Sequence, residues 1–325
     1  MEWAVELLGM SPIQTQKCQI GYFSVWLKYA RQNVARCKLQ LAVLCSIFMK
    51  KIILLSLFIF LLAGSLQAAP RYISLAPSTT EMLFALGLEE EIVGVSTYCN
   101  YPVQAQNKTQ IGNFSSPNIE KIISLKPDYI FCTGLEQAPV VARLRQLDLK
   151  VYVADPVSME ELFETFREIG AITHKVEAAS RLINQMQGQV KAVASKVELI
   201  PADKRVRVFV EIWHEPLMTV AKGSLVDELI TLAGGINIAH DLIRPYCNFS
   251  AEKVINLDPQ CIILAYMDSE APLKLIKQRF GWDKIEAVKH GQVFNDIDPD
   301  ILLRPGPRIA QGLEEVYKRL YPKKN

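Results

Sequence analysis

From residue 70 onward, apolar residues follow two patterns that alternate along the chain. Short apolar runs predict buried strands, and apolar residues three and four apart predict helices. In the first half the expected strands are 71–75, 92–96, 129–133 and 151–154, and the expected helices include 79–86, 139–147 and 159–169. In the second half the expected strands are 207–212, 261–266 and 293–295, and the expected helices are 225–232, 273–280 and 308–320. Such a βα series predicts mainly parallel sheets with right-handed crossovers.

One stretch of sequence occurs twice. NIEKIISLKPDYIF, residues 118–131, and SAEKVINLDPQCII, residues 250–263, share a Glu-Lys pair, a Leu, a Pro and an Ile at the same spacing. Asn118 and Ser250 are good N-caps, so each copy predicts a short helix. Pro127 and Pro259 then end the helix before a buried strand. The repeat predicts two similar α/β lobes.

A long helix is expected between the lobes. Residues 175–197 contain no Pro and carry apolar residues at spacings of three and four, which predicts one helix of about 34 Å at 1.5 Å per residue. The expected fold is therefore two Rossmann-like α/β lobes joined by one rigid helix, with little lobe movement. The expected boundaries are 70–173 for the first lobe, 174–200 for the helix and 201–325 for the second lobe.

A basic start at Met49-Lys50-Lys51 is followed by the apolar run IILLSLFIFLLAGSLQAAP. This pattern is typical of a secretory signal peptide, here residues 49–69, and indicates a periplasmic protein. Residues 1–48 are then interpreted as a mis-called N-terminal extension. A membrane anchor or an uncleaved signal anchor is the alternative. Residues 62–65 resemble a lipoprotein cleavage box with Ser65 in place of the acylated Cys, so no lipid anchor is expected.

Composition narrows the function classes. The 325 residues include 36 Lys and Arg against 34 Asp and Glu, and no basic face is visible, which argues against nucleic acid as the main partner. Four cysteines follow the leader. Cys132 and Cys261 lie in apolar strands and are expected to be buried thiols, whereas Cys99 and Cys247 lie beside aromatic residues and are the better disulfide or reactive candidates.

Candidate ligand residues gather after the predicted strands. In parallel α/β lobes, ligands bind beyond the carboxyl ends of the strands. A cleft lined there by aromatic faces suits a large, flat, partly apolar ligand, although core packing is the alternative for any single aromatic residue. The candidates are Pro77, Tyr98, Phe114, Thr133, Trp213, His214, Tyr246, Asp298 and Arg304.

Catalytic motifs are absent from the sequence. It contains no GxSxG, P-loop, HExxH or GxGxxG match, and its four histidines lack metal-ligand spacing. Trp213-His214-Glu215 is a weak candidate for acid/base chemistry. We therefore expect no enzyme activity, no metal site and no cofactor. A cofactor-bearing enzyme of the same fold is the alternative from another class, and it would need a catalytic constellation.

Glu120 and Glu252 occupy equivalent places in the two copies of the repeat. A carboxylate in the first helical turn interacts favourably with the helix dipole, by about 0.3 to 1 kcal/mol. Two such charges at matching points could also meet a two-fold symmetric partner that carries paired arginines.

Several segments between residues 70 and 321 resemble one family. They are SLAPSTTEMLFALG, YPVQAQ, NIEKIISLKPD, EPLMT, LAGGINIA and SAEKVINLDPQ. The chain is similar in these motifs to periplasmic cobalamin-binding proteins of ABC importers, within the helical-backbone class III of periplasmic binding proteins. That class also includes siderophore and haem carriers.

The resemblance implies a monomeric periplasmic protein that captures cobalamin, or a related corrinoid, and delivers it to a dimeric ABC permease. It implies that Glu120 and Glu252 dock on arginines of the permease. It also implies that cobalamin lies between the lobes, against Tyr98, Phe114, the Trp213 region and Tyr246, with Asp298 and Arg304 in a late loop. An enterobacterial member has Trp where this chain has Phe114, Thr133 and Tyr246, so the aromatic cage is thinner here.

An iron-siderophore or haem carrier is the alternative within the class. Siderophore binding would use converging basic residues such as Arg244 and Arg304. Haem binding would use an axial ligand, for which Tyr98, Tyr246 or His214 is available.

Overall fold

The structure is a computed structural model that describes residues 69–266 and 273–322, together with residues 28, 29, 31, 46 and 48–52. It divides into a unit of residues 1–68 and a unit of residues 69–325. Most of the expected extension and signal peptide lies outside the described residues. Within the described part, no helix combines the length and the apolar character needed to cross a membrane.

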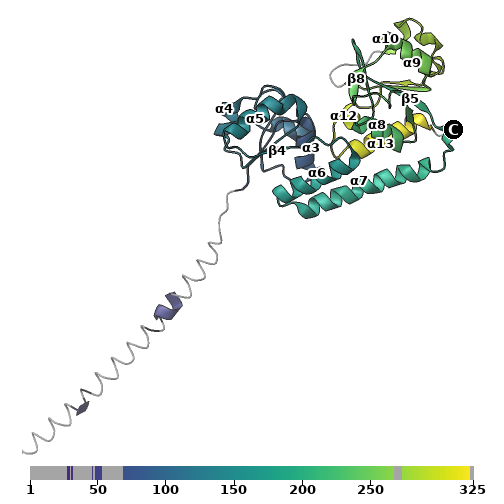
Figure 1. Ribbon diagram of the computed structural model, residues 1–325. Coiled ribbons are helices and arrows are strands. Elements are labelled where there is room, and N and C mark those ends of the chain that lie inside the picture. The colour runs from purple at the N-terminus through teal and green to yellow at the C-terminus, as the bar shows by residue number, and fades with distance from the viewer. Residues whose placement is uncertain are drawn as a thin grey trace, which may run out of the picture. The chain divides into compact units, whose positions relative to one another are not determined.

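The first sheet is parallel throughout, as the sequence predicted. Its order is β2-β1-β3-β4, with β1 (Tyr72–Ser74), β2 (Ile92–Val95), β3 (Tyr129–Cys132) and β4 (Val151–Val153). The helices that alternate with these strands are α3 (Pro77–Ala85), α4 (Ile119–Ser124), α5 (Ala138–Gln146) and α6 (Met159–Ile172). Short 3₁₀ turns at Val103–Asn107 and Leu135–Gln137 complete this lobe (Figure 1).

The second sheet is mixed. Its order is β10-β9-β5-β6-β8, and β7 pairs with β5. Its strands are β5 (Arg207–His214), β6 (Leu217–Val220), β7 (Ile236–Asn237), β8 (Tyr246–Asn248), β9 (Cys261–Leu264) and β10 (Val293–Phe294). The pairings of β5 with β7 and β9, and of β9 with β10, are parallel, whereas β6 is antiparallel to β5 and β8.

The sequence predicted a strand that ends at residue 212, but β5 continues through Trp213 and His214. A two-residue connection, Glu215 and Pro216, then leads into β6. This hairpin gives the backbone groups of the extended strand hydrogen-bond partners that the parallel neighbours do not reach. Tyr246, expected to follow a strand, is the first residue of β8.

Both copies of the repeat fold as helix and strand, as expected. They form α4 with β3, and α9 (Ala251–Leu257) with β9. The Asn118 side chain accepts a hydrogen bond from the Lys121 N–H at 2.9 Å, and Ser250 Oγ accepts one from the Lys253 N–H at 3.4 Å. The residue before each proline takes left-handed backbone, with φ 47° and 43°. The prolines therefore follow a turn that already ends the helix.

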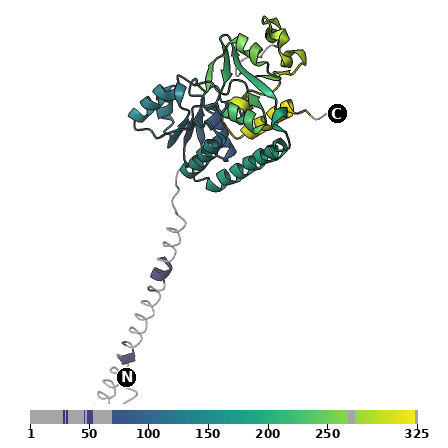
Figure 2. The ribbon, with the colours of Figure 1, turned by 45° about the vertical axis from the view of Figure 1, so that its right-hand side comes forward.

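The expected long helix is present as α7 (Val176–Val197). Its buried positions, which repeat at helical spacing, are Ala179, Ile183, Met186, Val193 and Val197. Helices α6, α8 (Leu225–Leu232) and α13 (Ile309–Leu320) pack against it, and Figure 2 shows α7 as a long rod. One hydrophobic cluster runs from the first sheet through α6, α7 and α13 to the second sheet.

Smaller elements complete the second lobe. They are the 3₁₀ turns Ala202–Lys204 and Trp282–Lys284, and the helices α10 (Leu273–Gln278), α11 (Glu286–Lys289) and α12 (Asp300–Leu303). Helix α12 lies between Asp298 and Arg304, in the late segment that was expected to be a loop.

All four cysteines of the described part are free thiols. Cys132 and Cys261 are buried, as expected, and burial raises the pKa of each thiol to about 12. Cys99 is also buried, at 3% exposure, so the expectation of an accessible reactive thiol there was wrong. Its Sγ lies 3.0 Å from Thr80 Oγ1 and 3.2 Å from Ser96 Oγ, and burial raises the pKa of this thiol as well.

Candidate functional site

In the first lobe the candidate residues lie beyond the carboxyl ends of the strands. Pro77 is the first residue of α3, and Tyr98, which follows β2, is 51% exposed. Phe114 and Thr133 are half-buried. A large apolar ring left this accessible is available for a ligand.

A buried glutamine joins two of these candidates. Gln137 Nε2 donates to the carbonyl oxygens of Leu75 and Phe114, at 3.0 and 2.8 Å. Its Oε1 accepts from the Thr133 N–H at 2.9 Å. Sequence reasoning missed Gln137, because a polar residue before a helix carries no signal of burial. It holds Phe114 and Thr133 in fixed positions relative to β1.

In the second lobe three aromatic rings form one group. Trp213 and His214 end β5, and their ring centroids lie 6.1 and 5.8 Å from that of Tyr266. The Trp213 indole N–H donates to the Glu215 carbonyl oxygen at 2.9 Å. Trp213 itself is 38% exposed. Tyr246 on β8 is 48% exposed. Among these four, sequence reasoning missed Tyr266, which it placed within an apolar strand.

A buried ion pair supports this aromatic group. Glu211 of β5 is fully buried and accepts two hydrogen bonds from Arg279, at 2.6 and 2.7 Å. The Tyr266 hydroxyl donates to the same carboxylate. Burial and the Glu211 charge raise the pKa of Tyr266, so its phenol stays protonated. The charged position inside the apolar run RVFVEIWH is the sequence signal that could have identified Glu211.

The late loop contributes Asp298 and Arg304, which lie in one ionic cluster. The Arg304 side chain is 10% exposed and lies 2.9 Å from Asp300 and 3.5 Å from Glu81. Arg308, which sequence reasoning missed, contacts Glu81 at 2.7 Å and Asp298 at 3.3 Å. The structure therefore brings the late loop to α3 of the first lobe.

One hydrogen bond and one electrostatic effect also connect the lobes. Glu228 of α8 accepts a hydrogen bond from the Met159 N–H at the start of α6, at 2.8 Å. Burial raises the pKa of Tyr246, and the Asp155 carboxylate, which follows β4, raises it further. The charge of a first-lobe residue thus reaches a candidate residue on β8.

Glu120 and Glu252 lie apart from this group. Both are exposed residues in the first turn of their helices, α4 and α9. Within residues 69–266 and 273–322, neither carboxylate has an ion-pair partner. Both are therefore free to meet a charge on another molecule.

Metal ligands do not cluster in the described part of the chain. There, no group of three or more His, Cys, Asp and Glu is placed to hold an ion. His240 Nδ1 lies 2.9 Å from Oδ2 of Asp227, a residue of α8. This contact holds the imidazole against α8.

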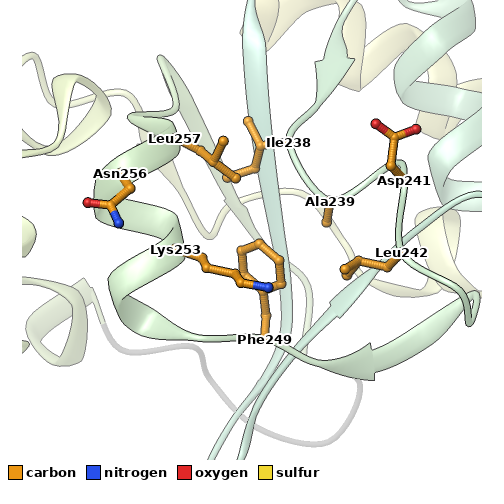
Figure 3. A pocket seen from close by; sticks show the side chains of 8 residues that line it. All are labelled: Ile238, Ala239, Asp241, Leu242, Phe249, Lys253, Asn256 and Leu257. Carbon is orange, nitrogen blue, oxygen red and sulfur yellow. The ribbon is translucent and has the colours of Figure 1, made fainter.

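A pocket of about 340 Å³ lies elsewhere on the second lobe, between α9 and the segment after β7 (Figure 3). None of the candidate ligand residues lines it. Leu257 lines it, although its counterpart in the repeat, Leu125, packs against the core of the first lobe. The lining residues are Ile238, Ala239, Asp241, Leu242, Phe249, Lys253, Asn256 and Leu257.

A relative named vitamin B12-binding protein, from Salmonella paratyphi A, is 36% identical over 256 residues, which cover 78% of this chain and 91% of the relative. An uncharacterized ABC transporter substrate-binding lipoprotein of Bacillus subtilis, YvrC, is 31% identical over 257 residues, 78% of this chain and 80% of the relative.

A solved structure, the periplasmic heme-binding protein RhuT from Roseiflexus sp. RS-1, has a TM-score of 0.70 and 25% identity. The similarity covers 78% of this chain and 98% of that chain. The family described as periplasmic binding protein matches residues 73–299. Since that match spans more than half of the sequence, the chain belongs to the periplasmic binding protein family.

Proposed function

We propose that this protein captures cobalamin, or a related corrinoid, in the periplasm and delivers it to the permease of an ABC importer. The observation that carries the proposal is the exposure of large aromatic side chains at the strand ends of both lobes. Tyr98 is 51%, Trp213 38% and Tyr246 48% exposed. Such rings offer a broad apolar surface to a large, flat cargo.

The choice of cargo is supported by the relative named vitamin B12-binding protein, which this chain matches over 91% of the relative's length. Haem is the competing cargo, because RhuT, whose name states haem binding, shares the fold. Tyr98, Tyr246 and His214 are the residues that would supply an axial ligand to haem.

The site is built for rigid recognition. In the first lobe, Gln137 fixes Phe114 and Thr133 through hydrogen bonds. In the second lobe, the Glu211–Arg279 pair holds Tyr266 through its hydroxyl, and the Tyr266 ring stacks with His214. Preorganised groups lose little entropy when a ligand binds. Arg304 has most of its surface covered by the chain. We therefore assign it to support of the site, and Asp298, which is half exposed, to its rim.

The deciding experiment is isothermal titration of the purified protein with cyanocobalamin, haem and a ferric siderophore in parallel. One-to-one binding of cyanocobalamin is the expected result. Trp213→Ala and Tyr98→Ala should each weaken binding by about 1 to 2 kcal/mol, roughly five- to thirtyfold in Kd.

Phe280→Ala is the matched control, because Phe280 is 99% exposed and lies outside the site; its Kd should not change. If cyanocobalamin gave no heat and haem or the siderophore bound, the proposed cargo would be wrong and the bound compound would take its place. Unchanged affinity in both aromatic variants would contradict the site.

The proposal also assigns a partner surface. Glu120 and Glu252 are exposed, occupy equivalent first-turn positions and are unpaired within the described residues. Paired arginines on a dimeric permease would bind both carboxylates at once. Export by the segment from Met49 belongs to the same proposal, and the intact mass of the mature protein would distinguish cleavage near Ala69 from a retained or acylated N-terminus.

A further inference from the structure

Glu81 of α3 is a charged residue in an almost wholly buried position, 2% exposed. An unpaired carboxylate there would be very unfavourable, because a charge loses its hydration on burial. Both of its partners come from the other end of the chain. Arg308 is 227 residues away from Glu81 in the sequence. Arg304 lies four positions before Arg308.

The pairing with Arg308 is bidentate. Arg308 Nε and Nη2 donate to Oε2 and Oε1 of Glu81, at 2.8 and 2.7 Å. Two parallel charge-assisted hydrogen bonds fix the plane of the guanidinium group. In this fixed orientation the guanidinium lies over the Tyr101 ring, 3.9 Å from its centre, and makes a cation–π contact.

Arg304 leads to the same loop. Its Nη1 lies 3.5 Å from Glu81 Oε1 and donates to Asn100 Oδ1 at 2.7 Å. Both arginines of Glu81 therefore hold one loop, residues 97–102, through Asn100 and Tyr101. The exposed Tyr98 lies in the same loop, two residues before Asn100.

We propose that Glu81 is a positioning residue for the candidate site: through Arg304 and Arg308 it holds the 97–102 loop, and with it Tyr98, in place for the cargo. The effect of Glu81 on cargo rests on the proposed function, whereas its effect on the loop does not. Arg304 and Arg308 are only 10% and 12% exposed. They therefore offer little surface to a ligand and act on the site through the loop.

Loss of the Glu81 charge removes one of two carboxylates that Arg304 and Arg308 share; the other is Asp300, at 2.9 and 3.9 Å. Arg308 then loses both of its hydrogen bonds to Glu81, and with them the fixed orientation in which it contacts Tyr101. The backbone hydrogen bonds of the loop, which include Cys99 N–H to the Ser96 carbonyl and Ala105 N–H to the Pro102 carbonyl, should open more often.

Hydrogen exchange of the ligand-free protein tests this link. In Glu81→Gln, amides of residues 97–108 should exchange faster, while those of α7 and the second sheet stay unchanged. Asn100→Ala removes an exposed partner of Arg304 without burying a charge, so it should show the same local effect in a protein that folds.

Two controls separate positioning from general destabilisation. Glu314→Gln removes a half-exposed carboxylate that pairs with Lys318 on α13 and should leave exchange unchanged. Ile130→Val trims a fully buried residue of β3 and should lower the melting temperature without selective exchange in 97–108. Unchanged exchange there in both Glu81→Gln and Asn100→Ala would overturn the proposal.

The second readout is the dissociation rate of cyanocobalamin. Loosening of the Tyr98 loop should speed dissociation about tenfold in Glu81→Gln, because changes within a binding surface act mainly on the off-rate. The Ile130→Val protein should release cargo at the wild-type rate. A loosened loop with an unchanged rate would overturn the role at the site. If the wild-type protein bound no cyanocobalamin, the proposed cargo would fail, and hydrogen exchange would still decide the role of Glu81.

Discussion

Glutamates of this chain take different roles because their burial differs. Glu120 and Glu252 are exposed and unpaired within the described residues, whereas Glu81 and Glu211 are buried and each accepts a bidentate arginine. In water an ion pair contributes little, about 0 to 1 kcal/mol. A buried carboxylate requires its partner, and removal of one side costs about 3 to 5 kcal/mol. The buried glutamates therefore determine where their arginines lie.

Glu228 is expected to make the free energy of unfolding depend on pH. Burial raises the pKa of its carboxyl, and the charges of Glu161 and Asp227 add to the rise, while the Met159 N–H opposes it. A carboxyl whose folded pKa is raised stabilises the fold at low pH, and this contribution disappears as pH rises through the folded pKa.

Glu228→Gln keeps an oxygen that can accept from Met159 and cannot ionise. The free energy of unfolding of the wild type, minus that of this variant, should therefore fall as pH rises from the ordinary pKa of a Glu carboxyl, about 4.3, through the raised pKa of the folded protein. Urea unfolding at several pH values measures the difference. A difference that rose with pH would contradict the assigned direction.

At the scale of elements, the amphipathic pattern predicted helices well. Helix α8 has the predicted bounds, and α7 begins one residue later than predicted. Strands of the first sheet match to within a residue or two at their ends. The β5–β6 hairpin was missed, because strand pairing depends on the neighbour that the chain meets in space. The apolar run alone did not show that β5 extends past Ile212.

Two helical glycines show how packing decides the effect of one methyl group. A Cβ on Gly312 of α13 would lie 2.2 Å from the Ile301 carbonyl oxygen, whereas a Cβ on Gly188 of α7 would meet nothing within 4 Å. Gly312→Ala should therefore destabilise the protein by about 1 to 3 kcal/mol through overpacking. Gly188→Ala should stabilise it by about 0.5 to 1 kcal/mol, because Ala favours a helix over Gly. Urea unfolding of both variants measures this contrast; equal effects would contradict the close approach of α12 and α13.

At the scale of the whole molecule, the two sheets share one hydrophobic cluster with α6, α7 and α13. The ionic contacts of Glu81 and the Glu228–Met159 hydrogen bond add fixed points between the lobes. The proposed cleft between the lobes would then need little rearrangement to bind its cargo. Glu120 and Glu252, in their proposed docking role, would keep a constant spacing for a symmetric partner.

The docking role predicts a separation of binding from transport. Glu120→Ala combined with Glu252→Ala should leave the Kd for cyanocobalamin unchanged and reduce uptake by cells that depend on this protein, because the lost charges face the permease and not the cargo. Glu177→Ala is the matched control, since Glu177 is an exposed carboxylate in the first turn of α7. Uptake by the double variant equal to that of the control would refute the docking role.

The sequence by itself determined most of the helices and the strands of the first sheet, the repeat with its N-caps, and the family. These features follow from the spacing of apolar residues and from side chains that act within a few positions, as Asn118 and Ser250 do. Only the tertiary structure decided the antiparallel edge of the second sheet and the buried partners of the site. Glu81 and Arg308 are 227 residues apart, and Glu211 and Arg279 are 68 apart. Such pairs form because the fold buries both charges at the same place. The spacing of residues along the chain does not indicate which distant residues will meet.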